Sequence, residues 1–211
     1  MSKKAPTKKL KKSPMFSKLN KHFFPDKEDV AQAYLYHSGD VTIDQCGELV
    51  EEIVMHNAPH FIEDEDGNLE PCEKPDVINL LITSSGGDMV AAFALINAMQ
   101  GSEVPIRTIV MGEASSAALC ILMAGDQRVI TPYASLLSHV FNSGTEGSYY
   151  SMKNMMSELD EYHKKMVGFY MEHTGLSQEV IDKHLLGDSD KWLSIDEALK
   201  YNIADVLLDL S

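Results

Sequence analysis

The sequence predicts an α/β protein in which buried strands alternate with helices in a layered core. Short apolar runs bounded by turn residues recur between residues 76 and 140, and segments of helical spacing separate them. The chain of 211 residues is long enough for one domain with a proper core and too short for two comfortable ones. Its composition, 44% hydrophobic and 24% charged, is typical of a soluble globular protein.

Residues 1–29 are predicted to form a basic, flexible N-terminal arm. Residues 1–27 carry nine lysines and one acid, whereas the remaining 184 residues carry nine basic and 31 acidic side chains, a net charge of −22. The arm is interpreted as a solubilising tail, or as a segment that contacts a partner protein or an acidic surface. A cleaved targeting peptide is disfavoured because the arm has no arginine. The acidic body excludes nucleic acid as a partner.

The sequence favours a cytoplasmic protein with no membrane partner. No run approaches the roughly 18 apolar residues that a membrane-spanning helix needs. No apolar segment of the signal-peptide type follows the N-terminus, so secretion is not expected. The three cysteines, Cys46, Cys72 and Cys120, are odd in number and scattered, which indicates reduced thiols in a cytosol-like compartment.

A single folded domain is predicted over residues 30–211. It begins with a strand over 33–42 and a helix over 44–57, and residues 58–76 then interrupt every pattern. With three prolines, seven acids and an Asp-Gly pair, these residues are predicted to form an acidic surface loop. His56 and His60 lie beside the acids, but a flexible run offers no fixed ligand geometry, so no metal site is expected.

The core elements are predicted from runs that switch between strand and helix periods. Apolar runs bounded by turn residues predict buried strands over 76–85, 104–112, 127–132 and 134–140. Helical spacing predicts a helix over 86–101, which stops at a C-terminal glycine, and a second helix over 116–124.

A long helix is predicted over 149–173, and an edge strand closes the chain. One apolar seam runs along six turns or more of this helix; it consists of Met152, Met155, Leu159, Tyr162, Met166, Phe169 and His173. Such a seam packs on the core of its own chain or, given its length and methionine content, against a neighbouring subunit. Ser194 and Glu197 predict a capping box at the start of a helix over 194–202, and IADVLLDL follows as the edge strand.

Two adjacent serines, Ser115 and Ser116, lie where the strand that ends at Gly112 gives way to a helix. A hydroxyl at a helix N-terminus either caps the helix or acts as a nucleophile, because unpaired N–H groups favour negative charge there. The preceding strand-to-helix junction holds Gly86 and Gly87, which allow a sharp turn and an exposed N–H. One such amide, together with the N–H after the nucleophile, makes an oxyanion hole.

In four segments the sequence resembles the proteolytic subunit of the Clp protease, ClpP. They are SSGGD (84–88), similar to N-S-P-G-G; MGEASSAA (111–118), similar to M-G-x-A-A-S-M-G; SLLSHVF (135–141), similar to the strand that ends in M-I-H-Q-P; and GDSDKWLSIDEALKYNIADVLL (187–208), similar to D-R-D-x-F-x-S-A-x-E-A-x-x-Y-G-L-I-D. The resemblance runs from about residue 33 to the C-terminus, interrupted by the acidic loop. It implies the ClpP/crotonase fold, with repeated ββα units and residues 149–173 as a protruding handle helix.

The resemblance implies a serine endopeptidase with no cofactor and no metal. Ser116 would be the nucleophile, His139 the base and Asp190 the acid that orients the imidazole, with Asp188 as the reserve candidate. The N–H groups of Gly87 and Ala117 would receive the oxyanion. An extended substrate would add as a strand along the residues Gly86, Asp88, Met89, Val140, Phe141 and Asn142.

The resemblance also implies a homo-oligomer of stacked, heptameric rings that enclose the active sites. Unfolded polypeptides would be fed in by an AAA+ ATPase, and short peptides would diffuse in, while the 149–173 helix interleaves at the ring–ring contact. The chain departs from the family pattern in having Ser85 in place of proline, Ala117-Ala118 in place of Met-Gly, and the lysine arm in place of an apolar pore loop.

Two other functions remain alternatives. One is a non-enzymatic ring partner or a specialised maturation protease of the viral type. The other is a crotonase relative that acts on acyl-CoA, which is disfavoured because that chemistry does not need a serine nucleophile.

Overall fold

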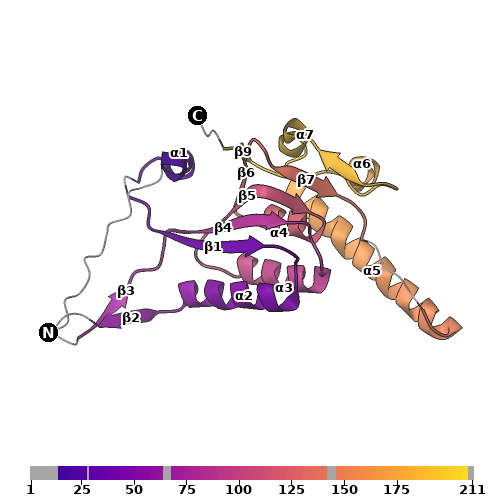
Figure 1. Ribbon diagram of the computed structural model, residues 1–211, viewed down its shortest axis with the longest axis horizontal. Coiled ribbons are helices and arrows are strands. Elements are labelled where there is room, and N and C mark those ends of the chain that lie inside the picture. Colours follow the sequence, from indigo (N-terminus) through magenta and orange to yellow (C-terminus); the bar gives the residue numbers. More distant parts are fainter. Residues whose placement is uncertain (1–13, 28, 64–67, 142–145, 209–211) are drawn as a thin grey trace.

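The computed structural model describes residues 14–27, 29–63, 68–141 and 146–208 (Figure 1). Its helices are α1 (Pro14–Phe23), α2 (Ile43–Asn57), α3 (Met89–Gln100), α4 (Ala117–Met123), α5 (Tyr149–Thr174), α6 (Gln178–His184) and α7 (Ile195–Lys200). Its strands are β1 (Gln32–Ser38), β2 (His60–Glu63), β3 (Leu69–Cys72), β4 (Val77–Ser84), β5 (Ile106–Ser115), β6 (Gln127–Ile130), β7 (Ser135–Ser138), β8 (Lys191–Leu193) and β9 (Val206–Leu207). The predicted alternation of strands and helices is present, so the α/β fold class is confirmed.

Most of the strands form one sheet in the order β1-β4-β5-β6-β9, and β7 joins it beside β5. All pairs along this path are parallel, whereas β8 pairs antiparallel with β7. β9 lies at the edge of the sheet, as predicted for the last strand. β5 extends beyond Gly112, where it was predicted to end, because Glu113–Ser115 pair with Ser135–Leu137 after the pairing with β6 stops at Val110.

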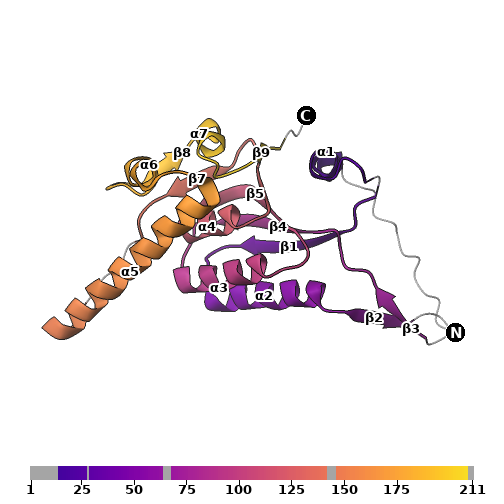
Figure 2. The same ribbon diagram turned by 180° about the vertical axis from the view of Figure 1, so that it is seen from behind.

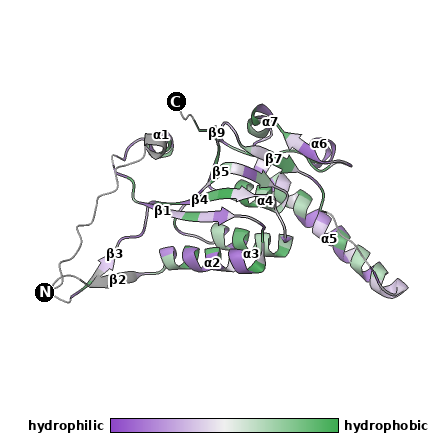
Figure 3. Cartoon of the chain, viewed as in Figure 1, coloured by the Kyte–Doolittle hydropathy of each residue, from purple (hydrophilic) through white to green (hydrophobic). Residues whose placement is uncertain are grey.

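The two faces of the sheet have different covers. Successive residues of a strand point to opposite faces, and Val110 and Ile130 belong to the main core, which also holds the buried residues of α2, α3 and α4. Their neighbours Ile109 and Val129 belong to a smaller cluster on the other face. Figures 1 and 2 show α2 and α3 on one side of the sheet and α1 on the opposite side. In Figure 3 much of β4, α3 and α4, at the centre of the fold, has the green colour of hydrophobic residues.

Helix α1 lies within the residues predicted to form a flexible arm; of that arm, residues 1–13 lie outside the described residues. Leu19 is 2% exposed and packs on Ile109, Val129 and Leu208, with Phe23 at the rim. The helix is therefore a docked element. Lysines dominate the composition of this segment, and two apolar residues one helical turn apart are enough to anchor it.

Arg107 on β5 holds the N-terminal segment in place beside this cluster. Its guanidinium is fully buried and donates hydrogen bonds to the side-chain oxygens of Asn20, Asn79 and Gln127. It also lies 5.1 and 5.6 Å from the ring centroids of Phe23 and Phe24. Burial lowers the pKa of Arg107 to about 10, so the group stays charged at neutral pH. The aromatic rings and amide oxygens offset part of the cost of burying that charge.

The segment predicted as an acidic surface loop, residues 58–76, contains a hairpin. β2 and β3 pair antiparallel, with His60 opposite Cys72, and stand apart from the main sheet. Residues 64–67 between them lie outside the described residues. The Asp-Gly pair seen in the sequence is the usual signal for such a hairpin. The strands were not predicted, because the acids and prolines around this pair favour a loop.

The predicted long helix is present as α5, with 26 residues. Its buried residues, Met166, Val167, Phe169, Tyr170 and Thr174, all belong to its C-terminal part. The N-terminal part is exposed and projects away from the body, as Figures 1 and 2 show. None of the helices in the described ranges is both long and apolar enough to cross a lipid bilayer.

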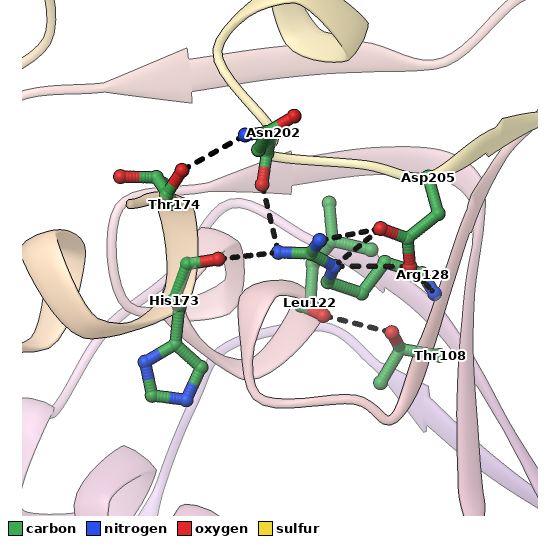
Figure 4. A network of polar contacts seen from close by, with 7 residues as sticks. All are labelled: Thr108, Leu122, Arg128, His173, Thr174, Asn202 and Asp205. Atoms are coloured by element: carbon green, nitrogen blue, oxygen red, sulfur yellow. Dashed lines mark hydrogen bonds and ion pairs between the residues drawn. The ribbon is translucent and has the colours of Figure 1, made fainter. Parts of the chain in front are cut away.

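A polar network fastens the C-terminal elements to the sheet (Figure 4). Arg128 on β6 forms an ion pair with Asp205 and donates to the carbonyl oxygens of His173 and Asn202 at 2.8 and 2.7 Å. The side chain of Arg128 therefore links the C-terminal end of α5 to the loop before β9. The predicted capping box at the start of α7 is confirmed, with Ser194 and Glu197 bonded reciprocally.

Candidate active site

Ser116 makes a strained turn between a strand and a helix. β5 continues to Ser115 and α4 begins at Ala117, so a single residue connects the two elements. Its backbone has φ 56° and ψ −122°, a conformation that side-chain-bearing residues rarely adopt and that costs on the order of 1–3 kcal/mol. A strained strand-to-helix turn of this kind is typical of the elbow that presents a nucleophilic serine.

The hydroxyl of Ser116 does not cap the helix. Ser116 occupies the N-cap position of α4, yet its side chain accepts no hydrogen bond from the first turn. Ser115, in contrast, is 1% exposed, and its hydroxyl donates to Oε1 of Glu113 at 2.7 Å. Of the two neighbouring serines, Ser116 is the one that is partly exposed. The cap, which was the alternative role for this hydroxyl, is therefore not realised.

Strands β7 and β8 bring His139 and Asp190 together. The strands are antiparallel, with Ser138 opposite Lys191, so the residue after β7 faces the residue before β8. Nδ1 of His139 lies 3.6 Å from Oδ1 of Asp190. The histidine side chain is 15% exposed and the aspartate side chain 64%. Asp188, the reserve candidate, is exposed, and it is Asp190 that pairs with the imidazole.

The parallel pairing of β5 and β7 places Ser116 at the same edge of the sheet. Ser115 lies opposite Leu137, and the N–H of Ser116 donates to the carbonyl oxygen of Leu137 at 2.9 Å. Ser116 and His139 thus follow two neighbouring strands. Because Nδ1 of the imidazole faces Asp190, Nε2 is the ring nitrogen left for the serine. No hydrogen bond between the Ser116 hydroxyl and His139 forms within the described part of the isolated chain.

Two glycines allow the backbone of the β4–α3 loop to approach this turn. A Cβ on Gly86 (φ +98°) would lie 2.6 Å from the carbonyl oxygen of Ser115 and 2.7 Å from Cβ of Ser116. A Cβ on Gly87 (φ +148°) would lie 2.4 Å from the carbonyl oxygen of Val41. All three distances are shorter than a real Cβ adopts, so the close approach requires glycine at both positions.

The N–H groups of Gly87 and Ala117 differ in their surroundings, because Gly87 is exposed whereas Ala117 is 0% exposed. Among the described residues neither N–H donates to a backbone oxygen, whereas their neighbours do: the N–H of Asp88 bonds Val41 and that of Ser116 bonds Leu137. Both belong to loops or helix starts that contact the Ser116 turn. An oxyanion hole requires two N–H groups that have no other acceptor, and within the described ranges these two amides meet that condition.

A pocket of about 250 Å³ opens beside Gly87. Its lining consists of Gly87, Asp88, Met89, Val90, Phe93, Phe141, Leu159, Tyr162 and Met166. Most of these side chains are apolar. The carboxylate of Asp88 caps α3 by accepting from the N–H groups of Val90 and Ala91 at 2.7 and 3.1 Å, so this acid is already committed.

The predicted substrate-binding residues fall into three groups. Asp88, Met89 and Phe141 line the pocket. Gly86 contacts the Ser116 turn, and Val140 packs against the main core. Asn142 lies outside the described residues.

Sequence reasoning missed the part of the pocket that α5 contributes. Leu159, Tyr162 and Met166 belong to the apolar seam of the predicted long helix, which was assigned to the core or to a neighbouring subunit. The helical period identifies the seam but does not say what it faces. Val90 and Phe93 on α3 carried no signal beyond being apolar.

Comparisons with known proteins agree with this arrangement. Residues 50–210 match the family described as Clp protease. The "ATP-dependent Clp protease proteolytic subunit 1" of Corynebacterium glutamicum is 33% identical over 144 residues, 67% of this chain and 68% of the relative. The proteins named "ATP-dependent Clp protease proteolytic subunit" from Deinococcus radiodurans and Pleurastrum terricola are 30% and 27% identical over 134 and 187 residues; these stretches cover 63% and 87% of this chain and 65% and 92% of the relatives.

The parallel sheet with its serine-bearing turn and the matched relatives define a peptidase of the serine type. The chain belongs to the Clp protease family.

Proposed function

We propose that the chain is a serine endopeptidase whose triad is Ser116, His139 and Asp190. Oγ of Ser116 attacks the peptide carbonyl while Nε2 of His139 takes its proton and then passes that proton to the leaving amine. Asp190 orients the imidazole and stabilises its charged form. The N–H groups of Gly87 and Ala117 bind the oxygen that becomes negative. Water then repeats the cycle on the acyl-enzyme.

The strained, uncapped Ser116 beside the His139–Asp190 pair is the observation that supports this proposal most directly. The strained backbone of Ser116 does not serve to cap α4, because its side chain makes no capping hydrogen bond. The serine and histidine are not hydrogen-bonded in the isolated chain. Catalytic hydrogen bonds are often loose without substrate, and we expect assembly and substrate binding to close this one.

The pocket beside Gly87 supports an apolar side chain on the substrate residue before the scissile bond. Met89, Phe93 and Phe141 line a space of about 250 Å³ next to the proposed oxyanion amides. The substrate itself would lie as an added strand on residues 86–89 and on the chain after His139.

For the assembly, we propose stacked heptameric rings in the cytoplasm that receive unfolded polypeptides from an AAA+ ATPase. The relatives' printed names, which include "ATP-dependent" and "proteolytic subunit", support a partner of this kind. The exposed methionines of α5, Met152, Met155 and Met156, support a ring–ring contact along its projecting part.

Hydrolysis of fluorogenic peptides by the assembled protein tests the proposed activity. Peptides with a large apolar residue before the cleaved bond are expected to be hydrolysed faster than peptides with an acidic one. Ser116→Ala is expected to abolish hydrolysis and labelling by a fluorophosphonate probe, and Ser115→Ala to retain both. An assembled wild-type protein that neither hydrolyses peptides nor reacts with the probe would support the non-enzymatic ring partner instead.

A further inference from the structure

The residue before the proposed catalytic histidine belongs to a buried pair of hydrogen-bonded hydroxyls. Oγ of Ser138, the residue before His139, is 2.9 Å from the phenolic oxygen of Tyr170 on α5. Ser138 is 0% exposed and Tyr170 1%. The two residues are 32 positions apart in sequence, so this bond is a tertiary link between the long helix and the end of β7.

Backbone pairing holds Ser138 on one side only, whereas Leu136 and Leu137 pair with both β5 and β8. The pairing of β7 with β5 ends at Leu137, so Ser138 is paired only with Lys191 of the three-residue strand β8. His139 follows outside any strand. A further attachment at Ser138 therefore restricts the point from which the histidine side chain projects.

The tyrosine is a fixed anchor. Burial raises the pKa of Tyr170 well above its ordinary value, so the phenol stays neutral and can donate or accept at any working pH. Its backbone is held as well, because Oγ1 of Thr174 donates to the carbonyl oxygen of Tyr170 at 2.6 Å. In this dry environment neither hydroxyl can exchange its partner for bulk water.

We infer that Tyr170 and Ser138 are positioning residues that fix His139 against Asp190 and Ser116. This inference rests on the proposed role of His139 as the base. It makes α5 responsible for two parts of the site, because the same helix supplies Leu159, Tyr162 and Met166 to the pocket wall. The alternative is a pair that serves core stability alone.

A double-mutant comparison separates positioning from stability. Tyr170→Phe and Ser138→Ala each leave one buried hydroxyl without a partner, whereas the combined variant removes both. Each single variant is therefore expected to lower the midpoint of thermal unfolding, and the combined variant to recover most of that loss. We expect kcat to fall between about tenfold and a hundredfold in all three variants, with KM little changed, because a displaced base impairs the chemical step.

Recovery of kcat together with stability in the combined variant would overturn the inference, as would full activity in Tyr170→Phe. Thr108→Val is the matched control: Thr108 is also 0% exposed, and its hydroxyl donates to the carbonyl oxygen of Leu122 near the end of α4, not to β7 or to Tyr170. This variant is expected to lose stability but keep kcat.

A structural readout keeps the inference distinct from the proposed function. In crystal structures of the wild-type protein and of Tyr170→Phe, we expect the Nδ1–Oδ1 separation of His139 and Asp190 to increase in the variant, whether or not the wild type reacts with a fluorophosphonate. An unchanged separation would contradict the inference. A wild type with no reactivity would contradict the proposed function.

Discussion

Gly86 controls the shape of the turn around Ser116. Replacing it with alanine would place a Cβ 2.6 Å from the carbonyl oxygen of Ser115, in a backbone conformation that alanine disfavours. The loop must then move away from the serine and take the Gly87 amide with it. We expect Gly86→Ala to lower kcat/KM for peptide hydrolysis by roughly a hundredfold.

Gly47→Ala is the matched control for this substitution. Gly47 lies inside α2, and a Cβ there would meet nothing within 4 Å. The variant is expected to keep full activity and to gain about 0.5–1 kcal/mol of stability in urea unfolding. Equal activity of Gly86→Ala and Gly47→Ala would show that the turn does not need glycine.

Single residues show how far sequence reasoning reaches into the site. The motif order selects Ser116, His139 and Asp190, and the structure brings His139 and Asp190 into contact through the pairing of β7 with β8. The sequence alone left open whether Ser116 caps the helix, because a cap and a nucleophile occupy the same position. Backbone conformation distinguishes the two roles, and no residue pattern encodes φ and ψ at one serine.

At the scale of elements, the docking of α1 was not predicted, because lysines dominate the composition of that segment. Leu19 is 2% exposed in the cluster with Ile109, Val129 and Leu208. Leu19→Ala is expected to weaken the docking of α1 by about 2–3 kcal/mol, which would raise amide hydrogen exchange over residues 14–23 and in β5. Lys21→Ala, at an exposed position on the same helix, should change the free energy of docking by less than about 0.5 kcal/mol. Equal exchange in both variants would mean that Leu19 does not anchor the helix.

The start of α7 predicts a pH dependence of stability. Glu197 accepts from Lys191 at 2.7 Å and from the N–H and hydroxyl of Ser194 at 3.0 and 2.9 Å. These bonds, that from Lys191 foremost, lower the pKa of Glu197 from 4.5 to about 2. A carboxyl whose pKa is lower in the folded state contributes stability above about pH 4.5 and loses that contribution as the pH falls toward 2.

Urea unfolding of Glu197→Gln between pH 7 and pH 2 checks this dependence. The variant is expected to be less stable than the wild type at pH 7 and to differ less from it at pH 2. Asp196→Asn, an exposed neighbour on the same helix, should follow the wild-type curve throughout. A Glu197→Gln curve parallel to the wild-type curve would contradict the assignment.

Helices and strands differ in how well the hydrophobic periodicity of their sequences predicts them. The strands and helices of the core were predicted because burial imposes a clear hydrophobic pattern on β4, α3, β5 and α4. The hairpin of β2 and β3 lacks that pattern, since it stands apart from the main sheet and its apolar residues Phe61 and Leu69 are exposed. Helix α1 depends on a few long-range contacts, which no local window of sequence contains.

At the scale of the whole molecule, α5 has two differently built ends. Its C-terminal third is buried beside Ser138 and the pocket, and its N-terminal part is exposed and carries Met152, Met155 and Met156. In the proposed assembly the projecting end joins the rings, so subunit contacts and the site lie on one rigid helix. In the isolated chain the pocket and the His139–Asp190 pair are therefore already present, although the hydroxyl of Ser116 is not hydrogen-bonded to His139.

Peptide mapping by mass spectrometry, after the assembled particle has reacted with a fluorophosphonate, identifies the nucleophilic residue directly. We predict one adduct per chain, carried by Ser116, present in Ser115→Ala and absent from Ser116→Ala. Native mass measurement of the same sample would show that each variant remains assembled. An adduct on Ser115, or labelling that persists in Ser116→Ala, would contradict the assignment of the nucleophile and with it the proposed reaction.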